Sequence, residues 1–205
     1  MSSATVHLLR HGQVHNPDAI VYGRMPDFHL SELGARMAEA AAADFRARVN
    51  QGDRYVVLAS SPLTRARETA APVARELGLD VVTEERIIEP RNHFQGLHVD
   101  EKVLSHPKHW PYMLNPLRPS WGESYDSIAA RMMAAAGAAR EFAEGREIVL
   151  VSHELCVWTA RQFAEGNRLW HDPRKRECRL ASVTTLTYHG DALSSVAYAE
   201  PCADL

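Results

Sequence analysis

The chain has 205 residues, of which 45% are hydrophobic and 24% charged, and its formal net charge is −3. This length and balance suit one soluble globular domain whose core needs no disulfide or structural metal. The weak negative charge disfavours nucleic acid and an anionic membrane surface as partners, so an anion site has to be a local cluster. Three cysteines without C-x-x-C spacing, and no leader-like or membrane-spanning apolar run, predict a cytoplasmic protein.

The first half of the chain alternates short apolar runs with longer amphipathic segments. Residues 6–9 predict a short buried strand, and the alanine-rich run 31–49 predicts a helix with Ser31 as its N-cap. The compact apolar run 55–59 predicts a second strand. A helix is expected over 62–77, with Pro62 at its first position and a glycine directly after its end.

The second half continues this alternation. Helices are expected over about 122–145 and from Glu154 to about 164. Further strands are expected at 81–83, 147–151 and 181–188, with an edge strand at 194–198. Strands that alternate with helices predict a three-layer, doubly wound α/β fold, in which a mainly parallel sheet carries helices on both faces.

The chain is expected to form a single domain of residues 1–205, and one stretch of it departs from the alternation of strands and helices. Residues 97–121 contain four prolines together with Trp110, Tyr112 and Trp121. So many prolines exclude a continuous helix and predict a Pro/aromatic-rich excursion. Long irregular segments in compact domains are often functional, so the excursion is either a surface feature or a lid over the active site.

Reactive side chains stand at the ends of several predicted strands. His11 follows the first strand beside Arg10, Arg65 follows the second, Glu89 comes after the third, and His153 follows the strand that ends at residue 151. Because ligands of open α/β sheets bind beyond the carboxyl ends of the strands, these groups should meet. A single histidine is usually structural, but a convergent set predicts a catalytic site.

The chemistry of this set is that of phosphoryl transfer. A neutral His11 can attack phosphorus and carry the phosphoryl group, while Arg10 and Arg65 bind its oxygens. Glu89 can protonate the leaving oxygen and then activate water if its environment raises its pKa. Asn16 offers a further neutral donor to the phosphate.

Five short blocks resemble the signatures of the histidine phosphatase superfamily, which includes cofactor-dependent phosphoglycerate mutases. They occur in the order of the family, between about residues 5 and 190. The blocks are LRHGQ (9–13), LSELG (30–34), SSPLTRARETA (60–70), GES (122–124) and VSHE (151–154). Each block is modest alone, and together they are specific.

The resemblance implies the phosphoglycerate mutase-like fold and a phosphohistidine intermediate on His11. It places Arg10, Arg65 and His153 around the phosphate, with His153 also in a catalytic role, and it implies neither a metal nor another cofactor. We expect a phosphatase for a small phosphorylated metabolite. A phosphoglycerate mutase is the alternative, disfavoured because those enzymes are usually longer, and a non-catalytic phosphate-binding module is disfavoured because a binder needs no nucleophile.

The sequence departs from the family pattern at several positions. Val14 stands where a Thr or Ser is common, and Asn16 lies one residue closer to His11 than in many members. Glu154 replaces a frequent glycine after the second histidine, where it would crowd or recharge the edge of the pocket. Substrate contacts are therefore expected from Glu154 and from Arg24, which lies in the loop after the nucleophile.

The block that carries the proton donor is also irregular. It reads EPRNHFQG (89–96), one residue shorter than the family pattern. Glu89 is the best match, and Glu84 and Glu85 are neighbouring alternatives.

Two other features carry weaker hypotheses. His106 and His109 are three residues apart but have a proline between them and no carboxylate or cysteine at ligand spacing, so no metal site is expected. The basic run 174–179, with Arg168 and His171 upstream, lacks the interleaved aromatics of a nucleic-acid site. It is either a solvated loop, an attractor for an anionic substrate or a contact with a second copy in a homodimer.

Overall fold

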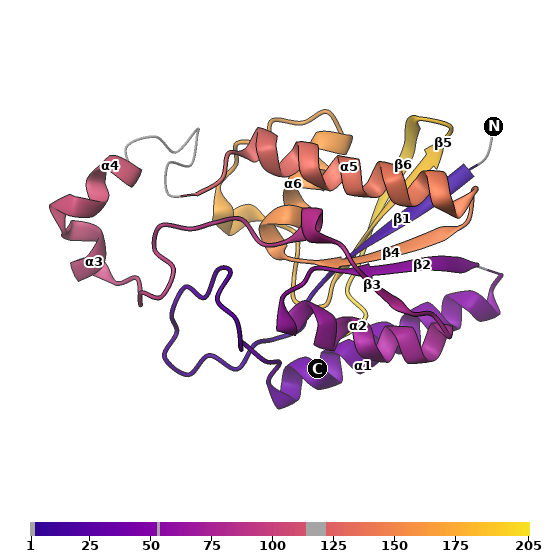
Figure 1. The fold of residues 1–205 in the computed structure, drawn as a ribbon, viewed down its shortest axis with the longest axis horizontal. Helices are drawn as coiled ribbons and strands as arrows, with labels where there is room; N and C mark the ends of the chain where they lie inside the picture. The colour runs from indigo at the N-terminus through magenta and orange to yellow at the C-terminus, as the bar shows by residue number, and fades with distance from the viewer. Residues whose placement is uncertain (1–2, 53, 114–121) are drawn as a thin grey trace.

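A six-stranded sheet forms the centre of the computed structural model, which describes residues 3–52, 54–113 and 122–205 (Figure 1). The strands lie in the order β3-β2-β4-β1-β5-β6. Their bounds are β1 Ser3–Arg10, β2 Tyr55–Ser60, β3 Val81–Thr83, β4 Glu147–Ser152, β5 Val183–His189 and β6 Ala192–Ala199. Neighbours from β3 to β1 pair in parallel, whereas β5 runs antiparallel to both β1 and β6. The predicted mainly parallel sheet is confirmed, with β6 at one edge.

Helices cover both faces of this sheet. The long ones are α1 Glu32–Asn50, α2 Thr64–Leu77, α5 Tyr125–Ala143 and α6 Glu154–Ala164. In Figure 1, α1 and α2 lie below the sheet and α5 and α6 above it. Side chains alternate across the strands, so Leu8 enters the core under α5 and α6, and Leu9 enters the core against α1 and α2. The doubly wound, three-layer fold is therefore confirmed.

Local hydrogen bonds account for where the helices begin and end. Ser31 caps α1 as predicted, since its hydroxyl accepts from the backbone N–H of Gly34 at 3.0 Å. Gly78 ends α2 with a left-handed φ of 66°. The prediction that Pro62 opens α2 was wrong, because Leu63 is the extended N-cap residue and its N–H donates to the Ser61 hydroxyl at 3.4 Å. That turn delays the helix to Thr64.

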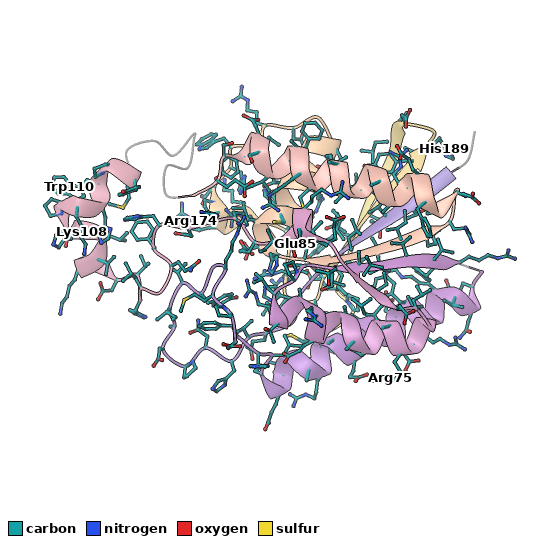
Figure 2. The ribbon with its side chains drawn as sticks, viewed as in Figure 1. Arg75, Glu85, Lys108, Trp110, Arg174 and His189 are labelled. Carbon is teal, nitrogen blue, oxygen red and sulfur yellow. The ribbon has the colours of Figure 1, made fainter. Side chains whose placement is uncertain are left out.

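The excursion contains short helices in its described part. These are α3 Glu101–Ser105, a 3-10 turn at Pro107–His109 and α4 Trp110–Met113. Figure 1 shows them to one side of the main body, and Figure 2 labels Lys108 and Trp110 on them. The two prolines and the tryptophan between residues 114 and 121 lie outside the described residues.

Among the described residues, no helix combines the length and apolar character that crossing a membrane requires.

Candidate active site

Three adjacent parallel strands place the candidate site residues at one edge of the sheet. Arg10 is the last residue of β1 and pairs in register with Ser152 of β4. The chain then continues the pairing for one more residue, since the His11 N–H donates to the Ser152 carbonyl and the Ser61 N–H to the Val151 carbonyl, both at 3.0 Å. His153 follows β4 directly and is the N-cap of α6. The side chains of three distant segments therefore meet beyond the ends of β2, β4 and β1.

His11 is held as a neutral imidazole with one nitrogen free. Its Nδ1 lies 2.8 Å from the carbonyl oxygen of Gly12 and must be the protonated nitrogen, because a carbonyl only accepts. Burial, followed by the charges of Arg65 and Arg10, lowers the pKa of His11 well below its ordinary value. Nε2 therefore carries a lone pair, which is the state that a nucleophile requires.

Close backbone packing fixes the loop that carries this histidine. The N–H of Gly12 donates to the hydroxyl of Thr69 on α2 at 3.1 Å. A Cβ on Gly12 would stand 2.5 Å from the carbonyl oxygen of Gly34, and a Cβ on Gly34 would stand 2.0 Å from that of Gln13. Both glycines are needed because the loop presses directly against the first turn of α1.

His153 lies opposite His11 and is completely buried. The centroids of the two rings are 5.2 Å apart. Burial lowers the pKa of His153 well below its ordinary value, and the charge of Arg65 adds to that effect. Its Nε2 hydrogen bonds with the Ser61 hydroxyl at 2.7 Å, and its Nδ1 lies 3.3 Å from a carboxylate oxygen of Glu89.

Two arginines supply the positive charge. Arg65 is 1% exposed, donates to the Gly23 carbonyl at 2.7 Å and lies over the ring of Tyr22, 4.7 Å from its centroid. Arg10 donates to the carbonyl of Cys178 at 2.5 Å. Within the described part of the chain, the buried Nε atoms of both arginines and Nδ1 of His153 make no hydrogen bond. Buried donors of this kind are normally satisfied, so the site is short of an acceptor.

Glu89 has the protonation behaviour of a general acid. Burial raises its pKa to about 7, while the nearby charges of Arg65 and Arg10 oppose that rise. Arg24 anchors this segment, because its Nε donates to the Glu89 carbonyl at 2.5 Å. The alternative Glu84 is engaged with Arg86 at 2.6 Å, and neither Glu84 nor Glu85 lines the cavity at the site.

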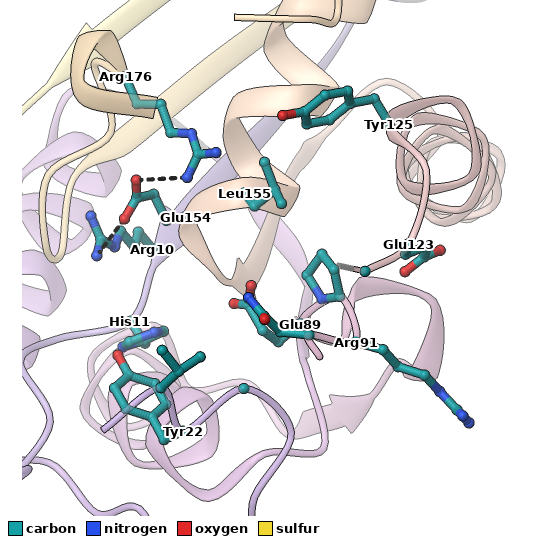
Figure 3. A pocket seen from close by; sticks show the side chains of 15 residues that line it. Arg10, His11, Tyr22, Glu89, Arg91, Glu123, Tyr125, Glu154, Leu155 and Arg176 are labelled. Atoms are coloured by element: carbon teal, nitrogen blue, oxygen red, sulfur yellow. Dashed lines mark hydrogen bonds and ion pairs between the residues drawn. The ribbon is translucent and has the colours of Figure 1, made fainter. Parts of the chain in front are cut away.

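Arg10, His11 and Glu89 border a cavity of about 240 Å³ (Figure 3). Arg65 and His153 are buried and are not among the residues that line it. Glu154 lies in its wall as an ion-pair bridge, 2.9 Å from Arg10 and 3.2 Å from Arg176. Arg176 thus belongs to the site, and the rest of the basic run 174–179 does not line it. Further lining residues that were missed from the sequence include Tyr22, Glu123, Tyr125 and Leu155. The loop after the first strand and the GES block were the available signals for Tyr22 and Glu123.

Two predicted contacts occupy places other than the wall of the cavity. The amide of Asn16 is used locally, donating to the carbonyl of Ile20 at 2.9 Å and accepting from its N–H at 3.2 Å. It closes the loop after His11 and is absent from the lining of the cavity. Arg24 lies behind the wall, where its guanidinium is 3.6 Å from Glu123. Residues 97–113 of the excursion do not line the cavity either.

A buried cysteine and a histidine of the excursion have structural roles near the site. Cys156 is buried, its thiol donates to the carbonyl of Ile88 at 3.2 Å, and burial raises its pKa to about 12. His109 hydrogen bonds with His93 at 3.0 Å and so ties the excursion to the segment after Glu89. Across the described ranges, no group of three or more His, Cys, Asp or Glu side chains could hold a metal ion.

Known proteins resemble this chain in sequence and in fold. A mycobacterial glucosyl-3-phosphoglycerate phosphatase structure is 26% identical, with a TM-score of 0.74 over 96% of both chains. An uncharacterized protein of Mycobacterium tuberculosis is 51% identical, over 97% of this chain and 96% of its own length. A protein of Yersinia pestis named as a probable phosphoglycerate mutase is 31% identical, over 89% of this chain and 84% of its own length. The sequence model of the Histidine phosphatase superfamily (branch 1) matches residues 6–201, and the chain belongs to that family.

Proposed function

We propose that this protein is a phosphatase that hydrolyses a small phosphomonoester through a phosphohistidine on His11, without a metal ion. The observation that carries the proposal is a neutral His11 beside Arg10 and Arg65, whose buried Nε atoms make no hydrogen bond with the described residues. Guanidinium donors and their positive charge suit a phosphate group, which offers several acceptor oxygens and a double negative charge.

In the first step, Nε2 of His11 attacks phosphorus and the bond to the ester oxygen breaks. Arg10 and Arg65 neutralise the oxygens of the phosphoryl group, and His153, whose Nε2 hydrogen bonds with the Ser61 hydroxyl, lies beside it with its ring 5.2 Å from that of His11. Glu89 gives its proton to the leaving oxygen, which departs as an alcohol. A pKa of about 7 leaves a large share of Glu89 protonated at neutral pH.

In the second step, the ionised Glu89 takes a proton from water as that water attacks the phosphohistidine. The phosphorus–nitrogen bond breaks, His11 regains its lone pair and inorganic phosphate leaves. Glu89 ends the cycle protonated, so one carboxyl group serves as acid and then as base.

Phosphoryl transfer of the mutase type is the second candidate, favoured by the 31% identity with the probable phosphoglycerate mutase. The two activities share the first step and differ in the acceptor, which is water in one and a sugar acid in the other. Incubation with 3-phosphoglycerate and 2,3-bisphosphoglycerate separates them, because a mutase yields 2-phosphoglycerate and a phosphatase yields free phosphate.

The covalent step is tested by quenching the enzyme with a phosphate-labelled monoester. We expect an acid-labile, base-stable label on the protein that is absent from His11→Ala. His189→Ala is the matched control, since His189 is exposed at the end of β5, and it should be labelled like the unaltered chain. Undiminished turnover by His11→Ala would exclude the mechanism. Loss of activity with a chelator and recovery with zinc would exclude metal independence.

A further inference from the structure

Glu154 is an acidic residue in the wall of a pocket that otherwise suits an anion. It is the first residue of α6, directly after His153; its side chain lines the cavity and is 33% exposed. Figure 3 shows its carboxylate between the guanidinium groups of Arg10 and Arg176, with both ion pairs drawn. A carboxylate there repels a second negative group on any substrate whose phosphate sits at His11.

The same carboxylate removes the cations that a second negative group would need. Its two oxygens engage Arg10 at 2.9 Å and Arg176 at 3.2 Å. Arg176 also makes a second contact, because its Nε donates a hydrogen bond to His171 at 2.8 Å. The partial burial of this bridge strengthens its electrostatic effect compared with a pair in open solvent.

On the opposite wall of the cavity, a carboxylate is likewise paired with arginines. Glu123 is 2.9 Å from Arg131 and 3.6 Å from Arg24. Arg91 also borders the cavity, but Figure 3 shows its side chain extending away from the other labelled groups. Arg131 and Arg176, beyond the phosphate end, are therefore engaged by carboxylates. Arg65, at the phosphate end, forms no ion pair with any described residue, so its positive charge remains there.

We infer that Glu154 is a specificity-determining residue, which selects monoesters whose alcohol carries hydroxyl or amino groups and rejects alcohols that carry a carboxylate. A carboxylate oxygen accepts a hydrogen bond from a hydroxyl or ammonium group and repels another carboxylate. The inference rests on the proposed binding of a phosphomonoester at His11.

The test uses two ligands that differ in a single group. Glycerol 3-phosphate carries a CH₂OH where 3-phosphoglycerate carries a carboxylate. For the unaltered chain we expect kcat/KM to favour glycerol 3-phosphate by about tenfold or more, the scale of one partly screened charge pair. Glu154→Gln should reduce this preference by about tenfold, mainly through improved use of 3-phosphoglycerate, and Glu154→Asp should keep most of it.

Glu39→Gln is the control, because it makes the same change of net charge on the exposed face of α1, where Glu39 pairs with Arg75. It should leave the preference unchanged. An equal loss for both ligands in Glu154→Gln would overturn the inference, since it would mean that Glu154 only positions Arg10. A preference for 3-phosphoglycerate by the unaltered chain would also overturn it.

Dissociation constants for the same two ligands, measured by calorimetry, separate this inference from the proposed function. A preference in binding that Glu154→Gln abolishes, in a protein that releases no phosphate from these esters or from p-nitrophenyl phosphate, would support the role of Glu154 and refute the phosphatase. Failure to bind either ligand would refute both the role of Glu154 and the proposed phosphatase activity.

Discussion

His11 and His153 are buried and Glu89 is half-buried beside them, and the fold moves their pKa values in opposite directions. Burial keeps both histidines neutral, and the adjacent arginines reinforce that effect. The same burial raises the pKa of Glu89 to about 7. Since burial disfavours whichever form is charged, one environment yields an unprotonated nucleophile and a protonated acid at the same pH.

Replacing Glu89 by Gln should slow hydrolysis in a way that depends on the leaving group. For an alkyl phosphate we expect kcat/KM to fall by about 10²- to 10³-fold, because the departing alkoxide needs a proton. For p-nitrophenyl phosphate the loss should be much smaller, since its leaving group is stable as an anion. Steady-state assays of both substrates provide the measurement. Glu85→Gln, outside the cavity, is the control, and an equal loss for both substrates would contradict the role of Glu89 as acid.

The pH dependence of the same variant gives an independent check. Glu89 must be protonated for the first step, so kcat/KM for an alkyl phosphate should decline as the pH rises through about 7, the pKa of Glu89. This alkaline limb should be missing from the residual activity of Glu89→Gln. If the variant keeps a decline in activity at the same pH, that decline must come from the ionisation of another group.

At the scale of elements, the site depends on how β1, its following loop and α1 pack together. The loop that holds His11 presses against the start of α1 through Gly12 and Gly34. Parallel pairing of β1 with β4 then places His11 beside His153. These contacts explain why a substitution at Gly34 can change the placement of His11.

Gly34→Ala should therefore disturb both stability and catalysis. The added Cβ would stand 2.0 Å from the backbone oxygen of Gln13, so the loop and α1 have to separate. We expect a loss of about 1–3 kcal/mol in the free energy of unfolding and a large fall in kcat. Urea denaturation and turnover assays measure the two effects.

Gly137→Ala is the matched control for that change. Gly137 lies inside α5 and a Cβ there would meet no atom within 4 Å. The same substitution should raise the free energy of unfolding by about 0.5–1 kcal/mol, because alanine is the better helix former. A destabilised Gly137→Ala, or a neutral Gly34→Ala, would contradict the packing argument.

At the scale of the whole molecule, the site places ionisable groups where they oppose folding. Glu89 has a folded pKa of about 7 against an ordinary value of 4.5, so its contribution to stability is present below pH 4.5 and is lost as the pH rises through 7. The two histidines act in the other direction. Their lowered pKa values mean that stability is lost as the pH falls below the ordinary value of 6.5.

Glu89→Gln should consequently stabilise the protein more at pH 8 than at pH 4.5. The difference between the two pH values should approach about 3 kcal/mol in the free energy of unfolding, as a pKa shift of this size implies. Urea denaturation of both proteins at both pH values measures it. An effect of the substitution that is the same at both would show that Glu89 ionises as freely in the folded chain as in the unfolded one.

The sequence by itself determined the order of the elements, the mainly parallel sheet and the meeting of His11, Arg65 and His153. Hydrophobic periodicity specifies strands and helices, and the carboxyl ends of parallel strands share one edge. Local turn chemistry was harder to predict, as the late start of α2 after Pro62 shows.

Only the tertiary structure decided what lies around His11, Arg65 and His153. Asn16 closes its own loop, whereas Arg176 reaches the cavity from the segment before β5 to bind Glu154. The pKa of Glu89 depends on burial by segments that are distant in the chain. Such properties arise from the packing of loops and from solvent exclusion, which neither periodicity nor a short motif encodes.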